Sequence, residues 1–145
     1  MGMTLVGVDG SEASGVALEF AVEEARLRGS SLRVICVWES PSLSQQEALT
    51  AAGLFDVLRE AAESVVAEAV ERAKELAPDI SCEGKALNGW PPGVLVEEAK
   101  GAELVVVGRR GQGALASLLL GSVSRHVADH APCPVVIVPP LARAH

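Results

Sequence analysis

Five short apolar segments, separated by longer segments with helical periodicity, constrain the fold of this chain more than any other feature. They are rich in Val, Leu and Ile and cover residues 4–8, 32–38, 80–87, 104–107 and 135–138. Such short apolar runs are typical of buried strands. Strands that alternate with helices form parallel sheets, and right-handed crossovers place helices on both faces. The sequence therefore predicts a doubly wound α/β fold with a five-stranded parallel sheet. The third segment has polar interruptions, so we expect it at a sheet edge.

Local signals mark the helices between these strands. Ser11 is expected to be the N-cap of the first helix, with Glu12 in its first turn, and Gly29 is expected to end it. Helices are also predicted over residues 56–77, 94–100 and 122–130, whereas residues 39–53 are predicted to be irregular, with capping-box spacing from Ser44 to Glu47. The apolar sides expected to be buried are Ala13, Ala17, Phe20, Ala21 and Ala25 in the first helix, and Leu58, Ala62, Val65, Ala69, Ala73 and Leu76 in the second.

Charge and cysteine content restrict the function. The formal net charge is −7, without a long run of Lys or Arg, which disfavours nonspecific binding to nucleic acid. The three cysteines form no CxxC pair, so neither a disulfide framework nor a zinc site is indicated. No apolar run approaches the length of a membrane span. We expect a single domain over residues 1–145 and a cytoplasmic location.

Three segments distant in sequence follow strands and are expected to meet at the carboxyl edge of the sheet, where doubly wound folds bind ligands. They are Asp9-Gly10-Ser11, Val37-Trp38 and the segment that begins at Gly108. Asp9 is either a turn residue or a ligand contact. Trp38 lines either a ligand pocket or the core.

The third segment is Gly-rich and leads into a helix. It runs through Gly108, Gly111 and Gly113 to Gly121-Ser122. Glycines allow a close approach of the backbone to phosphate, and the N–H groups at a helix start favour an anion. The hydroxyls of Ser122 and Ser124 are candidate additional donors, and Arg109 and Arg110 are candidate charges. The segment matches neither a Walker A loop nor a dinucleotide GxGxxG motif.

The chain resembles the universal stress protein family. The ATP-binding members of that family carry Gly-x2-Gly-x9-Gly-[Ser/Thr] after the fourth strand, and Gly108, Gly111, Gly121 and Ser122 match this spacing. Further similarity lies in the early Val-x-Val-Asp-Gly-Ser, in Gly89-Trp90-Pro91 and in the segment from Ala131 to Val135. The first strand departs from the family's frequent Pro-x-Asp ending, because Gly7 stands in place of the proline.

The resemblance implies a Rossmann-like fold of the adenine nucleotide alpha hydrolase type, with strand order 3-2-1-4-5, and a homodimeric ATP-binding protein of the stress response. Asp9 would lie by the adenosine, the backbone of Val37 at the adenine and Gly108 near the ribose. Gly111, Gly121, Ser122 and Val123 would hold the phosphates. The nucleotide is expected to be ATP, or ADP or AMP, with Mg²⁺ held through the phosphates. The complete expected set is Val8, Asp9, Val37, Gly108, Arg109, Gly111, Gly113, Gly121, Ser122, Val123 and Ser124.

The last strand, Val135–Val138, is expected to mediate the dimer, since pairing with its own copy would cover an apolar edge. His126 and His130 are four residues apart on one helix, which fits a metal pair or a solvated helix face. No catalytic residues are assigned. The main hypothesis is a nucleotide-sensing regulator. The alternatives are a slow ATPase, an adenylating enzyme or flavoprotein subunit of related fold, and an interaction module with an empty pocket.

Overall fold

The computed structural model describes residues 2–50, 52–109 and 120–140. The five strands form one parallel sheet in the order β3-β2-β1-β4-β5, as predicted. The strands are β1 (Met3–Gly7), β2 (Ser31–Trp38), β3 (Cys82–Asn88), β4 (Leu104–Gly108) and β5 (Val135–Val138). The helices are α1 (Glu12–Arg28), α2 (Gln45–Thr50), α3 (Ala52–Leu76), α4 (Pro91–Glu98) and α5 (Ser122–His130).

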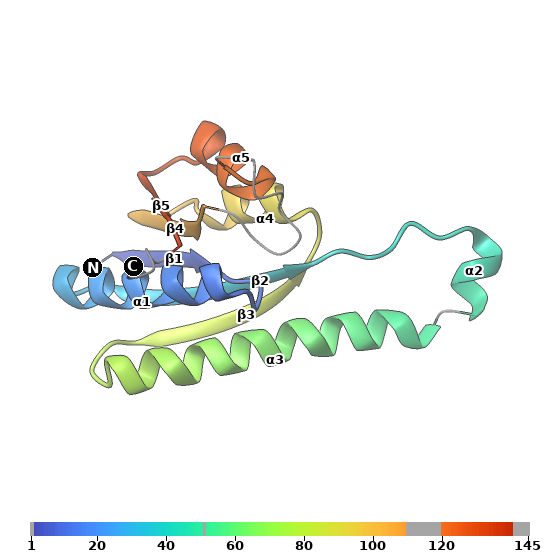
Figure 1. Cartoon of the computed structure of the whole chain (residues 1–145), viewed down its shortest axis with the longest axis horizontal. Coiled ribbons are helices and arrows are strands. Elements are labelled where there is room, and N and C mark those ends of the chain that lie inside the picture. Colours follow the sequence, from blue (N-terminus) through green and yellow to red (C-terminus); the bar gives the residue numbers. More distant parts are fainter. Residues whose placement is uncertain (1, 51, 110–119, 141–145) are drawn as a thin grey trace, which may run out of the picture.

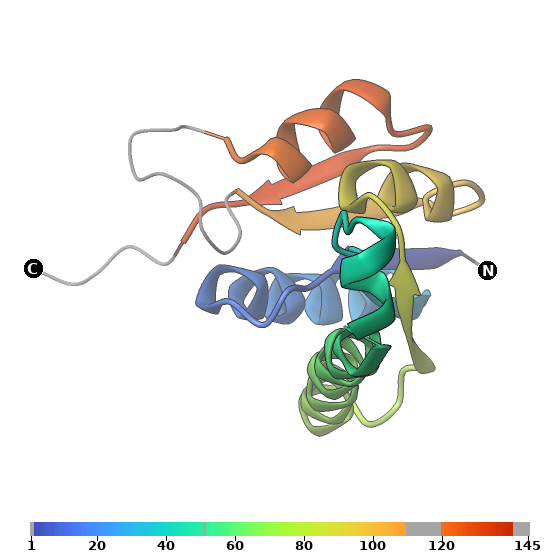
Figure 2. The same ribbon diagram turned by 90° about the vertical axis from the view of Figure 1, so that its right-hand side faces the viewer.

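Helices cover both faces of the sheet (Figures 1 and 2). Successive strand residues face opposite sides, so Val6, Val34 and Val106 pack with α1 and α3. Leu5, Ile35 and Val105 pack on the other face with α4 and α5. The central strands are buried on both sides, which explains their nearly unbroken apolar sequences.

The ends of α1 agree with the sequence signals. The Ser11 hydroxyl accepts a hydrogen bond from the Ser14 N–H at 3.1 Å, as an N-cap does. Gly29 ends the helix at φ 66°, a left-handed conformation that glycine adopts without a steric penalty. These signals are local, and the structure confirms them.

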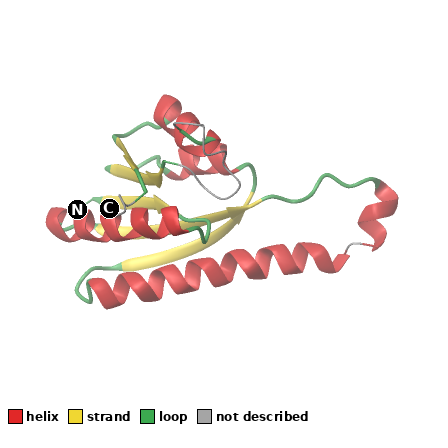
Figure 3. Cartoon of the chain, in the orientation of Figure 1, coloured by secondary structure: helices red, strands yellow, loops and turns green. Residues whose placement is uncertain are grey.

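Three predictions about helices are wrong in detail. The segment expected to be irregular contains α2, which follows the hydrogen bond from the Glu47 N–H to the Ser44 hydroxyl. Helix α3 begins at Ala52, four residues before the predicted start, and its beginning extends beyond the sheet together with α2 (Figure 3). Helix α4 begins at Pro91, because proline suits the first turn, where its missing N–H has no intrahelical partner.

The predicted apolar stripes contain two errors. Phe20 is 39% exposed, while Leu18 and Val22 of the same helix are buried. Leu76 is 40% exposed, because α3 turns the side of Val66 and Ala73 toward the sheet instead. No helix within the described residues is long and apolar enough to cross a membrane.

Candidate functional site

Three neighbouring strands bring the predicted segments to one edge of the sheet. Strand β1 lies between β2 and β4, so Asp9, Val37 and Gly108 all come at or just after carboxyl ends of adjacent strands. The N–H of Val8 donates to the Ile35 carbonyl at 2.9 Å and extends the β1–β2 ladder by one residue. The Val8 side chain is buried among α1 and α3, so only its backbone lies at the edge.

Asp9 organises the turn between β1 and α1. Its Oδ1 accepts a hydrogen bond from the Ser11 N–H at 2.9 Å, and its own N–H donates to the hydroxyl of buried Ser14 at 3.2 Å. The Ser14 hydroxyl in turn donates to the Ser11 carbonyl. The turn role of Asp9 is therefore established by these bonds. They also fix the half-buried carboxylate at the carboxyl edge.

Gly108 brings β4 against the start of α1. A Cβ at this position would lie 3.3 Å from the Ala13 carbonyl oxygen and 3.5 Å from the Ala13 Cβ. A glycine therefore allows β4 and α1 to pack closely at this point, independently of any ligand. Ala13 was predicted only as a core residue, and its contact with Gly108 depends on the folded arrangement of α1 and β4.

The beginning of α5 is anchored to the backbone that leaves β4. The N–H of Gly121 donates to the Arg109 carbonyl at 2.8 Å, and the Ser124 hydroxyl donates to the same carbonyl at 2.7 Å. The Arg109 N–H donates to the Val138 carbonyl at 2.9 Å, which ties this point to the last strand. Ser124 is 1% exposed. Its hydroxyl hydrogen is used inside the protein, which differs from the predicted role as a phosphate donor.

The first turn of α5 is open to an anion. Gly121 is the N-cap, and as a glycine it has no side chain to cap the helix start. The first N–H groups of a helix lack intrahelical acceptors, and the helix dipole adds partial positive charge there. Ser122 is exposed and Val123 is half-buried, so the turn can be reached from outside. This geometry suits a phosphate or another oxyanion.

Arg109 adds a second feature that fits an anion. Its Nε is buried and has no hydrogen-bond partner among the described residues. A buried guanidinium N–H without an acceptor is unfavourable, and an oxyanion would satisfy it. The residue with the unsatisfied Nε is therefore the one whose carbonyl holds the start of α5. Gly111 and Gly113, both in the predicted set, lie outside the described residues, as does Arg110.

Val37 and Trp38 end β2 on opposite faces of the sheet. Val37 packs on the α4 and α5 side, whereas Trp38 packs against the α1 and α3 side. The Trp38 carbonyl accepts bonds from the Gly89 N–H at 3.0 Å and the Asn88 side-chain amide at 3.2 Å. Of the two predicted roles, the structure supports core packing for Trp38.

Cys36 lies beside this edge but is not disposed to ionise. Burial, with a smaller contribution from the nearby Asp9 carboxylate, raises the pKa of the Cys36 thiol to about 11. A thiol with a raised pKa is a poor nucleophile at neutral pH. Cys36 therefore belongs to the core beneath the edge.

The predicted His126 and His130 pair has aromatic neighbours. The two rings stack with centroids 4.1 Å apart, and Trp90 meets the His126 ring edge-on at 4.8 Å. The His130 Nδ1 donates to the His126 carbonyl at 3.0 Å. Within the described part of the chain, no group of three or more His, Cys, Asp or Glu side chains could hold a metal ion.

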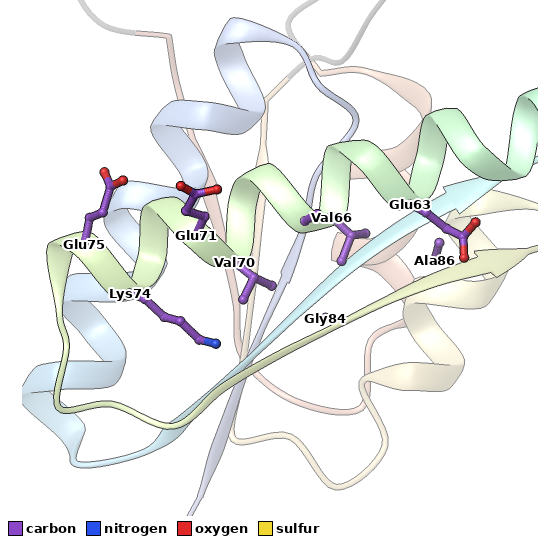
Figure 4. Close-up of a pocket in the computed structure, with 9 residues that line it drawn as sticks. Glu63, Val66, Val70, Glu71, Lys74, Glu75, Gly84 and Ala86 are labelled. Atoms are coloured by element: carbon purple, nitrogen blue, oxygen red, sulfur yellow. The ribbon is translucent and has the colours of Figure 1, made fainter.

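A groove that the sequence did not predict lies away from this edge, between α3 and β3 (Figure 4). Its lining residues follow α3 at helical spacing and β3 at alternate positions, a pattern that only the paired elements reveal. The carboxyl edge carries the predicted constellation, whereas this groove contains none of the predicted binding residues.

The fold and the edge together define a doubly wound α/β domain in which a helix start lies beyond the carboxyl ends of the strands, the place where such folds bind ligands. The chain belongs to the universal stress protein family, whose family model matches residues 3–139. This confirms the resemblance seen in the sequence.

Curated relatives and solved structures support the same family. A universal stress protein of Mycolicibacterium smegmatis is 37% identical over 144 residues, covering 94% of this chain and 45% of its own length. One of Mycobacterium tuberculosis is 35% identical, covering 92% of this chain and 43% of its own length. The chain thus spans about half the length of these curated relatives.

Among solved structures, UspA from Lactobacillus plantarum superposes with a TM-score of 0.85 at 25% identity, covering 94% of this chain and 97% of that one. A universal stress protein in complex with cAMP has a TM-score of 0.75 at 29% identity, with coverage of 97% and 98%. The protein from Archaeoglobus fulgidus in complex with dAMP has a TM-score of 0.69 at 25% identity, with coverage of 95% and 98%.

Proposed function

We propose that this chain binds an adenine nucleotide at the carboxyl edge of its sheet and acts as a nucleotide-dependent regulator in the stress response. The observation that carries the proposal is the junction of β4 and α5, where the start of α5 is hydrogen-bonded to the backbone of Arg109, whose buried Nε has no partner among the described residues. The cAMP and dAMP complexes of its structural relatives support an adenine nucleotide as the ligand.

The proposed placement follows the elements of the edge. The phosphates are bound by the N–H groups of Ser122, Val123 and Ser124 and by the Arg109 guanidinium. The ribose lies by Asp9 and Gly108. The adenine lies at the Val37 backbone. Gly111 and Gly113 complete the phosphate site in this proposal, and the proposed ligand is ATP with Mg²⁺ held through its phosphates.

Isothermal titration calorimetry with ATP, ADP, AMP, cAMP and adenosine tests the proposal. Arg109→Gln removes a charge-assisted hydrogen bond, so we expect ATP affinity to fall by about tenfold or more. The affinity for adenosine, which has no phosphate, should fall much less. Arg28→Gln, in the last turn of α1 at the opposite edge of the sheet, removes the same charge and should leave every affinity unchanged.

The result that excludes the proposal is binding of none of these nucleotides by the folded protein. If Arg109→Gln lowers the affinities for ATP and for adenosine equally, the proposed phosphate contact is contradicted. Turnover of ATP above background, lost in Asp9→Ala, would make the protein a slow ATPase instead.

A further inference from the structure

The groove between α3 and β3 lies at the open edge of the sheet. It has a volume of about 800 Å³. Val66, Val70 and Ala86 give it an apolar floor, and Glu63 and Lys74 lie toward its opposite ends (Figure 4). The complete lining is Glu63, Val66, Ala67, Val70, Glu71, Lys74, Glu75, Gly84 and Ala86. We call it the β3 groove.

The backbone of β3 directs alternate N–H and C=O groups away from β2, along this groove. The Leu32 N–H donates to the Ser81 carbonyl at 2.8 Å, and the Gly89 N–H donates to the Trp38 carbonyl at 3.0 Å. In a parallel ladder, alternate residues direct both backbone groups to the same neighbour. The odd-numbered residues of β3 therefore bond to β2. The N–H and C=O groups of Cys82, Gly84 and Ala86 point away from the sheet.

Cys82, Gly84 and Ala86, the three residues whose backbone groups point outward, are small, and α3 packs directly over them. A Cβ at Gly84 would lie 2.3 Å from Val66 Cγ1 and 2.8 Å from Val70 Cγ2, so no side chain fits between helix and strand. Glu83 and Lys85 point to the opposite face, where Glu83 accepts a 2.7 Å bond from Arg33. The free backbone strip therefore has small residues under α3 and opposite charges on the other face.

We propose that β3 pairs with β3 of a second copy of this chain, antiparallel about a two-fold axis at Gly84. Gly84 then faces Gly84, and Cys82 faces Ala86, in the hydrogen-bonded positions that the outward backbone groups require. Glu83 faces Lys85 of the second copy at the closer, non-hydrogen-bonded positions. Glu83 of each copy thus lies opposite Lys85 of the other, and these opposite charges favour this register.

The charges on α3 are also placed so that the same two-fold axis brings opposite charges together. Lys74 lies near the amino end of β3, and Glu63 lies near Ala86 (Figure 4). A two-fold axis at Gly84 brings the Lys74 end of one groove to the Glu63 end of the other. Glu71 and Glu75 also line the groove but point away from β3, so the charges on the strand side are those of Lys74 and Glu63 (Figure 4). Their exchange across the axis, together with the pairing of Glu83 and Lys85, favours a second copy as the occupant.

A disulfide across the pairing tests the register directly. Opposed residues at hydrogen-bonded positions have Cα atoms about 5.5 Å apart, a distance that a disulfide spans. Ala86→Cys places a thiol opposite native Cys82, and Cys36→Ala in the same variant removes the thiol beside position 86 on β2. With diamide as oxidant, we expect a cross-linked dimer on a non-reducing gel.

The matched control adds Cys82→Ser to that variant and should stay monomeric on the gel. Peptide mass spectrometry should identify the link between positions 82 and 86. Failure of the folded variant to cross-link at concentrations where the chain is associated would overturn the proposal and make a foreign extended strand the occupant to be sought. Thermal unfolding establishes that each variant is folded.

Charge reversal provides a second test without cysteines. Lys85→Glu places four carboxylates together, so we expect association through this edge to weaken about tenfold. Adding Glu83→Lys restores opposite charges and should restore association. Lys100→Glu makes the same change in the turn after α4 and should have no effect in sedimentation experiments. Weakening that the double variant does not relieve would contradict the pairing.

Discussion

Gly108 and Gly15 differ in the space that surrounds them. A methyl group at Gly108 would press on the Ala13 backbone, whereas nothing lies within 4 Å of a Cβ at Gly15. We expect Gly108→Ala to lower the free energy of unfolding by about 1–2 kcal/mol through overpacking. Gly15→Ala, inside α1, should raise it by about 0.5–1 kcal/mol. Urea unfolding measures both, and a neutral Gly108→Ala would show that α1 moves away at no cost.

Cys36 makes stability depend on alkaline pH. Burial, with the Asp9 carboxylate, raises the pKa of Cys36 from 9.0 to about 11 in the folded state. Below pH 9 the thiol is protonated in both states, and its contribution to stability is complete. As the pH rises from 9 to 11, the unfolded state loses its proton first, so the folded state is destabilised.

The decrease in the free energy of unfolding caused by Cys36 ionisation reaches about 1 kcal/mol at pH 10. Urea unfolding of wild type and of Cys36→Ala at pH 7.5 and pH 10 measures it, because other titrations cancel in the comparison. The stability difference between the two proteins should shift by this amount in favour of Cys36→Ala. A difference that does not change with pH would mean that the thiolate is solvated in the folded protein.

Residue roles could be predicted where the signal is local. Ser11 as N-cap and Gly29 as helix end follow from a few neighbouring residues, and both are confirmed. The inward hydroxyl of Ser124 and the exposure of Phe20 could not be predicted. Each depends on which side of its helix meets the sheet, and small residues on several sides of a helix leave that orientation open.

At the scale of elements, α5 is positioned by one buried hydroxyl. Ser124 donates to the carbonyl that also accepts from Gly121, so its loss loosens the connection between β4 and the helix start. We expect Ser124→Ala to lower stability by about 1–2 kcal/mol. Ser122→Ala, on the exposed side of the first turn, should change it by less than about 0.5 kcal/mol. Chemical denaturation compares the two, and equal effects would contradict the anchoring role.

Element types were easier to predict than element ends. The bounds of α5 and β5 agree with the prediction because prolines and glycines flank them. The prediction missed α2 and the first turn of α3, since Pro41 and several serines suggested an irregular segment. The groove on β3 was missed because it depends on the distance between a helix and a strand, and a sequence pattern does not contain that distance.

For the whole molecule, the alternation of strands and helices predicted the fold class, and the family resemblance supplied the strand order that the structure confirms. That order leaves β3 and β5 as the two outer strands. The candidate site lies between them, at the carboxyl ends of the inner strands. Association through either outer strand therefore leaves the proposed nucleotide site accessible.

The proposed pairing of β5 with its own copy can be separated from pairing at β3. The Val105 N–H donates to the Pro134 carbonyl and the Arg109 N–H to the Val138 carbonyl, so even-numbered residues of β5 bond to β4. The N–H of Ile137 therefore points to the open edge. Proline is tolerated there, because it removes only an outward donor.

We therefore expect Ile137→Pro to abolish association through β5 while the ladder with β4 remains. Ile137→Ala is the matched control, since it also loses the side chain but keeps the N–H. Sedimentation velocity over a concentration series compares the two variants. If both outer strands pair, the wild type forms species larger than a dimer, and Ile137→Pro stops at a dimer joined through β3. If Ile137→Pro and Ile137→Ala associate equally, β5 does not pair through its backbone.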